Sequence, residues 1–130
     1  MRLTFLICSA LLMMTFACKP KDPFVVNDQM LNSVPDSVIV VDSMINILTD
    51  IQLAEAYVNE MRSDSIPKED RLKQYYSEIF SMHHIDGTSY KRSYDYYVGN
   101  PILMNHIYVK VTEKLNLMES EHATVKKNVK

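Results

Sequence analysis

The fold is decided by residues 42–61, DSMINILTDIQLAEAYVNEM. Apolar residues recur there at steps of four, three, four and three positions, at Ile47, Ile51, Ala54, Val58 and Met61. An α-helix turns once every 3.6 residues or so, about the same spacing, so these side chains share one face. Asp42 can cap the first turn, because its carboxylate accepts free backbone N–H groups. The segment predicts an amphipathic helix of about 20 residues with Asp42 as its N-cap.

A second helix is predicted after the break at Ser63-Asp64-Ser65. Pro67 suits its first turn, and it ends around His83-His84. Its expected buried residues are Leu72, Tyr75, Tyr76, Ile79 and Phe80.

Two further helices follow the turn at Asp86-Gly87. The third is short, is capped by Thr88 or Ser89, and stops at Gly99 in the left-handed conformation. Asn100-Pro101 opens the fourth. The apolar stripe of that helix is Leu103, Ile107, Val111, Leu115 and Met118. Periodicity is lost from Glu119 onward, so residues 119–130 are expected to fray.

These elements predict an all-α domain over residues 37–118, a small bundle of three long helices plus one short helix. Residues 18–36 contain three prolines and little apolar periodicity, which predicts an extended tether. Phe24-Val25-Val26 and the run from Val38 to Val41 offer an alternative, as short extended segments packed against the bundle.

Residues 1–17 have the pattern of an export signal that is removed. Arg2 supplies a positive charge, and residues 3–16 are uncharged and mostly apolar. That run is too short for a membrane-spanning helix, which needs about 20 residues. Small Ala17 then precedes Cys18, and the chain turns polar at once.

Two cleavage interpretations follow. Thr15-Phe16-Ala17-Cys18 can be a lipobox, so that Cys18 is acylated and becomes the first residue of the mature chain. Alternatively, Thr15 and Ala17 form an ordinary signal-peptidase site, and Cys18 stays a free thiol. We favour lipidation: Cys8 is lost with the signal, and secreted chains rarely keep one odd thiol. Cys18 then anchors the protein in the cell envelope. Since residues 19–22 carry no clear surface-export signal, we expect the periplasmic face of the outer membrane.

Composition excludes several classes of function. The formal net charge of −2 becomes −3 when Arg2 is removed, whereas nucleic acids select basic surfaces. With two glycines there is no glycine-rich phosphate loop, and no G-x-S-x-G elbow occurs. We predict no enzyme activity, no cofactor and no nucleic-acid partner.

The acidic and histidine residues do not form a recognisable site. Asp50 and Glu55 are five positions apart, which separates them by roughly 140° on a helix, so we expect them to be solvated or paired with Lys91 or Arg92. Neighbouring His83 and His84 diverge by about 100°, and no metal-ligand spacing accompanies them, so no metal site is predicted.

Tyrosines are the most unusual local feature, with seven between positions 75 and 108. Tyrosine suits interfaces because it offers apolar area and a hydroxyl at low entropic cost. The candidate interaction residues are Tyr90, Tyr94, Tyr96, Tyr97 and Tyr108. The alternative is that tyrosines fill the core with their hydroxyls at its edge, and their helical spacing favours this.

From about Val38 to Leu115 the chain resembles small helical lipoproteins of Bacteroidetes that are catalogued only as a domain of unknown function. The resemblance rests on Asp42-x-Met44 with Leu53-Ala54-Glu55-Ala56, on Tyr75-Tyr76-x-x-Ile79-Phe80 with His83-His84-Ile85, and on Ser93-x-x-Tyr96-Tyr97-x-x-Asn100-Pro101. It implies a lipidated helical envelope protein and brings no known activity, cofactor or catalytic residue. The sequence differs from the group at His84, where a glycine often sits, which leaves the loop geometry open.

The leading functional hypothesis is a non-enzymatic envelope lipoprotein, an accessory or adaptor subunit that binds another envelope protein. The alternative is a small-ligand or peptide binder that uses a tyrosine-rich groove. A hydrolase using Asp50, Glu55 or His84 is the third.

Overall fold

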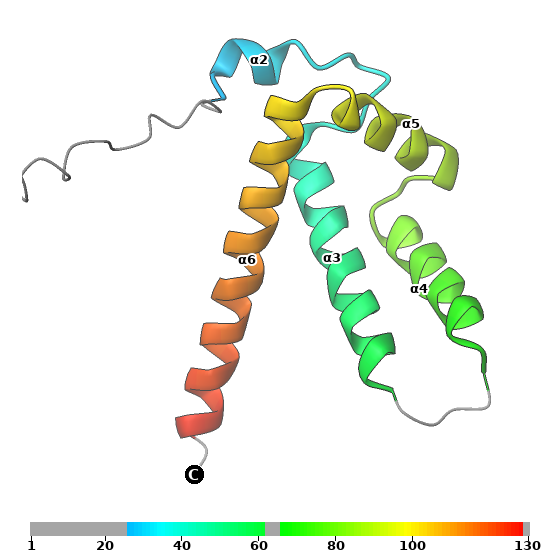
Figure 1. Ribbon diagram of the computed structural model, residues 1–130, viewed down its shortest axis with the longest axis vertical. Helices are drawn as coiled ribbons and strands as arrows, with labels where there is room; N and C mark the ends of the chain where they lie inside the picture. Colours follow the sequence, from blue (N-terminus) through cyan, green and yellow to red (C-terminus); the bar gives the residue numbers. More distant parts are fainter. Residues whose placement is uncertain (1–25, 62–65, 129–130) are drawn as a thin grey trace, which may run out of the picture.

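A computed structural model describes residues 26–61 and 66–128, which form helices and connecting turns (Figure 1). In chain order the helices are α2 (Asp28–Asn32), α3 (Val41–Glu60), α4 (Lys68–Met82), α5 (Gly87–Val98) and α6 (Pro101–Asn128). The predicted all-α fold is confirmed. The three long helices and the short one are present, and α2 is an addition to them. Residues 1–25, which include the predicted signal and Cys18, lie outside the described part of the chain, as do residues 62–65 and 129–130.

Helix α3 is the centre of the fold, because it packs against both α4 and α6 (Figure 1). Towards α4 it buries Ile47, Ile51 and Ala54, which form a cluster with Ile79. A second stripe, Val41, Met44 and Leu48, packs with Leu103, Ile107 and Val111 of α6. The predicted single stripe is therefore incomplete, since α3 has two adjacent apolar faces. Met61 follows the end of α3 and is exposed.

The start of α3 differs from the prediction. Val40 occupies the N-cap position, with no side-chain hydrogen bond to the first turn. Asp42 is the second residue of the helix and lies in its first turn, where its negative charge interacts favourably with the partial positive charge of the N-terminus.

Helix α4 follows Pro67 and ends at Met82, as predicted, with His83 as its C-cap. Of its five expected buried residues, Ile79 is buried and the other four are half-buried. Helix α4 covers only one side of α3, so the aromatic side chains of α4 remain partly exposed to solvent.

The loop after α4 takes the geometry that glycine normally provides. His84 has a φ of 55°, in the left-handed region. The Ile85 N–H donates to the Phe80 carbonyl over 3.0 Å, and the His84 N–H donates to the Ser81 carbonyl over 3.1 Å. This pair of bonds is a Schellman motif, in which the left-handed position most often carries glycine. The loop geometry is thus the usual one, formed here with a histidine.

Both ends of α5 require corrections. Asp86 is the N-cap, since its Oδ1 accepts from the Ser89 N–H over 2.7 Å, so neither Thr88 nor Ser89 has that role. Gly99 is right-handed, with a φ of −70°. No left-handed turn is needed there, because Asn100 satisfies the end of the helix. Its N–H donates to the Tyr97 carbonyl over 2.9 Å, and its Nδ2 donates to the Tyr96 carbonyl over 2.7 Å.

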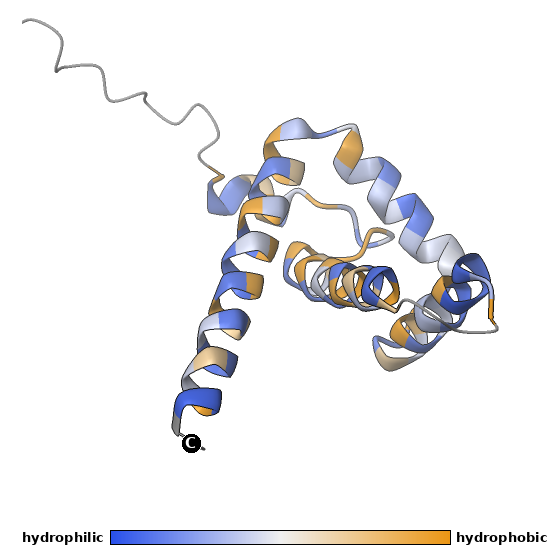
Figure 2. Cartoon of the chain, turned by 60° about the horizontal axis from the view of Figure 1, so that its bottom comes forward, coloured by the Kyte–Doolittle hydropathy of each residue, from blue (hydrophilic) through white to orange (hydrophobic). Residues whose placement is uncertain are grey.

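Helix α6 begins at Pro101 and continues to Asn128, so helical structure extends beyond the end of the predicted apolar stripe, and fraying of residues 119–130 stays a prediction. Lys126 and Lys127 lie in its last turn, where positive charge complements the helix dipole. Figure 2 shows the apolar edge of the first turns of α6 directed towards α3, and the last turns extending away from the other helices. Met118, expected in the core stripe, is exposed.

Part of the predicted tether belongs to the folded domain. Asn27 caps α2 by accepting from the Met30 N–H over 2.9 Å. Four residues of this region pack against the α3–α6 core, namely Val26, Met30, Leu31 and Val34. The alternative that the run from Val38 to Val41 packs as an extended segment holds for Val38, which is buried, and Ile39, which packs against the core; Val40 is exposed, and Val41 is the first residue of α3. Phe24 and Val25 lie outside the described residues.

Two buried side chains of α5 hold the segment that enters α3. The Ile39 N–H donates to Ser93 Oγ over 2.9 Å, and Ser93 in turn donates to the Ser89 carbonyl over 2.8 Å. The Tyr97 hydroxyl donates to the Ile39 carbonyl over 2.6 Å. Ser93 and Tyr97 are fully buried. Together they supply the partners that a neighbouring strand would give to Ile39.

Removing either partner of Ile39 is expected to destabilise the domain. Ser93→Ala leaves the Ile39 N–H without an acceptor, and Tyr97→Phe leaves its carbonyl without a donor, each at a cost of about 1–3 kcal/mol. Urea unfolding followed by circular dichroism measures this change. Tyr96→Phe is the matched control, because the Tyr96 hydroxyl makes no hydrogen bond within residues 26–61 and 66–128. Equal stability of Tyr97→Phe and Tyr96→Phe would contradict the assignment.

Replacing His84 by glycine is expected to stabilise the protein. A left-handed non-glycine residue costs about 1–2 kcal/mol, and the greater freedom of glycine in the unfolded chain offsets part of that gain. We therefore expect His84→Gly to raise the free energy of unfolding by up to about 1 kcal/mol, measured in urea. His84→Ala, which retains a Cβ, is expected to give no gain. Destabilisation by His84→Gly would show that the histidine side chain is itself needed there.

Candidate functional site

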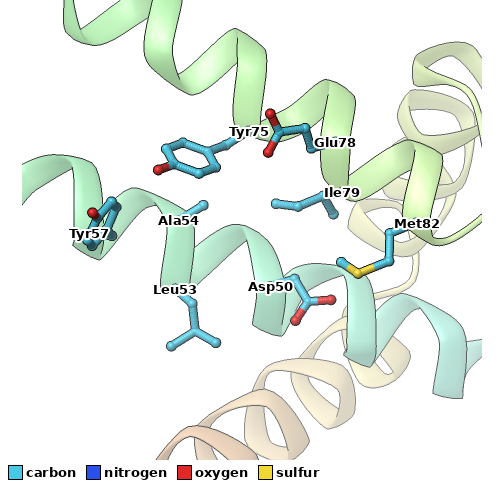
Figure 3. A pocket seen from close by; sticks show the side chains of 8 residues that line it. All are labelled: Asp50, Leu53, Ala54, Tyr57, Tyr75, Glu78, Ile79 and Met82. Carbon is cyan, nitrogen blue, oxygen red and sulfur yellow. The ribbon is translucent and has the colours of Figure 1, made fainter.

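A groove of about 480 Å³ runs along the seam between α3 and α4 (Figure 3). Each helix contributes four side chains at the same helical spacing, so two stripes face each other. The lining residues are Asp50, Leu53, Ala54 and Tyr57 of α3, and Tyr75, Glu78, Ile79 and Met82 of α4. The two helices are antiparallel, so Tyr57 lies near Tyr75 at one end and Asp50 near Met82 at the other (Figure 3).

The groove is apolar and its walls are open to solvent. Ala54 and Ile79 are buried at its base, whereas Leu53, Tyr57 and Met82 are 40%, 52% and 62% exposed. The ring of Tyr57 packs edge-on against Tyr75, with 6.0 Å between their centroids. Contiguous exposed apolar side chains around a concave surface are typical of a binding site.

Carboxylates border the groove. Asp50 Oδ2 lies 2.7 Å from His83 Nε2, which ties the end of α4 to the middle of α3. Glu78 accepts a hydrogen bond from Gln74 over 3.1 Å, and no described lysine, arginine or histidine forms an ion pair with it. The rim therefore carries negative charge beside an apolar floor.

The structure separates Asp50 from Glu55, as their spacing predicted. Asp50 pairs with His83, whereas Glu55 accepts a hydrogen bond from the hydroxyl of Tyr76. The expected pairing with Lys91 or Arg92 is wrong. Lys91 pairs with Asp95 of its own helix over 2.5 Å, and Arg92 Nε donates to the Ser37 carbonyl over 3.1 Å.

The two neighbouring histidines have different surroundings. His83 is held by Asp50, and His84 is exposed in its left-handed turn. No group of three or more potential metal ligands occurs in the part of the chain that the structure describes. Within the same residues, no hydroxyl or thiol lies within hydrogen-bonding distance of the His83 ring.

The five candidate tyrosines divide into two groups. Tyr97 is a core residue, and the ring of Tyr96 packs edge-on against it at 5.4 Å. Tyr90, Tyr94 and Tyr108 belong together: the rings of Tyr90 and Tyr94 are 6.0 Å apart, and the hydroxyls of Tyr94 and Tyr108 are 3.4 Å apart. The core alternative thus holds for Tyr97, whereas Tyr108 remains 39% exposed.

The second group extends across α4 to α3. The ring of Phe80 lies 4.9 Å from Tyr90 and 6.3 Å from Tyr76, whose hydroxyl reaches Glu55. We call Glu55, Tyr76, Tyr90, Tyr94 and Tyr108 the tyrosine cluster. It draws at least one residue from each of α3, α4, α5 and α6.

The environment of the cluster raises the pKa of three of its hydroxyls. Burial and the hydrogen bond to Glu55 raise the pKa of Tyr76 to about 12. The hydrogen bond with Tyr94, together with burial, raises the pKa of Tyr108 to about 12. Burial above all, with the nearby Tyr94 and Tyr76, raises the pKa of Tyr90 further. At neutral pH each of these groups is therefore a hydroxyl that can both donate and accept.

The groove escaped sequence analysis because its exposed residues flank the predicted stripes. Leu53 and Tyr57 adjoin the buried Ala54 and Val58 and widen the apolar face of α3 beyond what one neighbouring helix covers. The unusual width of this apolar face is the sequence feature that could have predicted the groove. Tyr76 and Glu55 lie on different helices. The hydrogen bond between them depends on how α4 packs against α3, which helical periodicity does not predict.

Comparisons with known proteins identify a family. A family model described as "Domain of unknown function (DUF4296)" matches residues 35–121. No curated protein and no solved structure matched the chain. None of the helices in the described residues is long and apolar enough to cross a membrane. Because the family match covers well over half of the chain, including α3 to α5 and most of α6, this protein belongs to the family of the DUF4296 domain of unknown function.

Proposed function

We propose that this protein is a lipid-anchored, non-enzymatic adaptor of the cell envelope, which binds an amphipathic helical segment of another envelope protein in the α3–α4 groove. The observation that supports this most is the row of exposed apolar side chains along an otherwise well-packed helix pair. Leu53, Tyr57 and Met82 flank the buried Ala54 and Ile79, and the ring of Tyr57 packs against that of Tyr75.

The shape of the groove suits a helix. Two antiparallel helices leave a straight furrow between them, and an amphipathic partner can insert side chains at its i, i+3, i+4 and i+7 positions. The lining residues repeat with this same spacing on both walls, because both walls are helical. A volume of about 480 Å³ accommodates two or three such anchoring side chains.

The charge of the rim indicates the chemistry of that partner. Glu78 of α4 lacks a basic partner among the described residues, and Asp50 of the facing α3 wall adds a second carboxylate, which is paired with His83. A segment with apolar anchors and a flanking lysine or arginine therefore fits better than an acidic one. Such complementarity contributes more to specificity and association rate than to affinity.

The anchor in this proposal is lipid on Cys18, at the periplasmic face of the outer membrane. Among the described residues, the first that packs against the core is Val26, so at most seven residues separate Cys18 from the domain. That stretch spans at most about 30 Å when fully extended, because one residue covers no more than about 3.3–3.6 Å. The domain would therefore work close to the bilayer, and its partner would be a membrane-proximal protein.

Lipidation is tested by comparing wild type with Cys18→Ala in the native bacterium. Wild type is expected to incorporate a labelled fatty acid, to show the added mass in intact-mass spectrometry, and to fractionate with membranes. Cys18→Ala is expected to lose all three properties. Identical membrane partition of both proteins, with no lipid on either, would contradict the anchor.

Groove binding is tested with a photo-crosslinking residue placed at Leu53, at Met82 or, as a control, at Val98. All three side chains are exposed, so the fold is expected to tolerate each change, and Val98 lies on α5, outside the groove. We expect the two groove positions to crosslink one partner within an apolar, basic-flanked helical segment identified by peptide mass spectrometry. Leu53→Glu should abolish co-purification of that partner. Equal crosslinking from Val98, or crosslinks to an acidic polar segment, would contradict the proposal.

A further inference from the structure

A second recognition surface lies on the opposite side of the α3–α4 seam. Glu55 lies two residues after the groove residue Leu53, and Tyr76 lies two residues before the groove residue Glu78; two residues turn a side chain by about 200° around its helix. Leu53 and Glu78 therefore face one side of the helix pair, and Glu55 and Tyr76 face the other. We infer that the tyrosine cluster binds an organic cation, an ammonium or guanidinium group such as the end of a lysine or arginine side chain.

The first support is an uncompensated charge. The Glu55 side chain is half-buried and accepts a hydrogen bond from the hydroxyl of Tyr76. Among residues 26–61 and 66–128, no lysine, arginine or histidine forms an ion pair with it. A partly desolvated carboxylate gains most from a cation that comes from outside the chain.

The second support is a row of aromatic groups that begins at this carboxylate. The rings of Tyr76, Phe80, Tyr90 and Tyr94 follow one another at centroid separations of 6.3, 4.9 and 6.0 Å, and the hydroxyl of Tyr108 continues the row 3.4 Å from that of Tyr94. The negative charge of Glu55 contributes to the raised pKa values of Tyr76, Tyr90 and Tyr108, as expected if all three lie within its field.

The chemistry of these groups favours a positively charged ligand. The face of an aromatic ring is electron-rich and attracts a cation within about 6 Å. Hydroxyl oxygens accept hydrogen bonds from N–H donors, and an ammonium or guanidinium group has three to five of them. An anion would be repelled by Glu55. A neutral polyol would satisfy the hydroxyls but would gain nothing from the carboxylate.

This site is independent of groove binding, because the two surfaces share no residue. It is also partly accessible, since Tyr108 is exposed at one end of the cluster. The remaining members are half-buried, which limits the ligand to a narrow cationic end rather than a bulky group.

NMR titration of the purified protein, with the tyrosine ring signals resolved, tests the inference. The probes are n-butylammonium, a lysine-containing tripeptide with blocked ends, and n-butanol as a neutral equivalent of the amine. The matched variants are Glu55→Gln, which keeps an acceptor for Tyr76 but removes the charge, and Glu60→Gln, which removes an exposed charge from the same helix.

We expect saturable shifts of the Tyr76, Tyr90 and Tyr108 ring signals with either amine, weakened about tenfold by Glu55→Gln and unchanged by Glu60→Gln. Tyr108→Ala, at the exposed end, should weaken binding several-fold without unfolding the domain. A response to the tripeptide alone assigns the site to protein side chains, and a response to both amines assigns it to organic cations in general. Equal responses to n-butylammonium and n-butanol, equal binding by wild type and Glu55→Gln, or no response to any probe would overturn the inference.

Discussion

The two hydrogen bonds that α5 makes to the backbone of Ile39 determine how the rest of the domain is arranged. A buried N–H or carbonyl without a partner is costly, and the extended residue before α3 has no neighbouring strand. Ser93 and Tyr97 supply both partners from one face of α5. This fixes α5 across the entrance to α3 and thereby places the first turn of α6, which begins three residues after α5 ends. Ile39 and Tyr90 each touch both hydrophobic clusters, so this junction joins the α3–α6 core to the α3–α4 core.

Helices with strong periodicity and proline starts could be predicted from the sequence, because those signals are local. The stripe of α3 and the starts after Pro67 and at Pro101 follow from side-chain spacing and from the fixed backbone of proline. Contacts between distant residues could not be predicted. Ser93 and Tyr97 meet a residue more than fifty positions earlier, and α2 gains its stability from the α3–α6 core rather than from its own five residues. Two predicted N-caps were displaced by two or three residues: Asp86 has the role expected of Thr88 or Ser89, and Val40 occupies the position expected of Asp42.

The candidate sites were predictable only in part, for the same reason. The tyrosines stood out by their number, yet sequence alone could not assign Tyr97 to the core and Tyr108 to the surface. That division depends on which face α5 turns towards Ile39 and on which face α6 turns towards α3. The groove arises because α4 covers only part of the wide apolar face of α3. Both proposed recognition surfaces therefore lie along one helix pair and on opposite sides of it, the groove acidic at its rim and the tyrosine cluster centred on Glu55. For both surfaces we therefore expect a partner that is rich in lysine or arginine.

Amide hydrogen exchange at Ile39 tests the central role of the α5 junction most directly. Ile39 precedes α3, so its N–H makes no bond within a helix, and its only acceptor in the described residues is Ser93 Oγ. If the junction holds the domain together, this amide exchanges as slowly as those of Ile47 and Ile107, at a rate that reports global unfolding. Fast exchange at Ile39, like that of an exposed loop amide, together with full protection of α3 and α6, would show that the helices pack without the junction and would contradict this account.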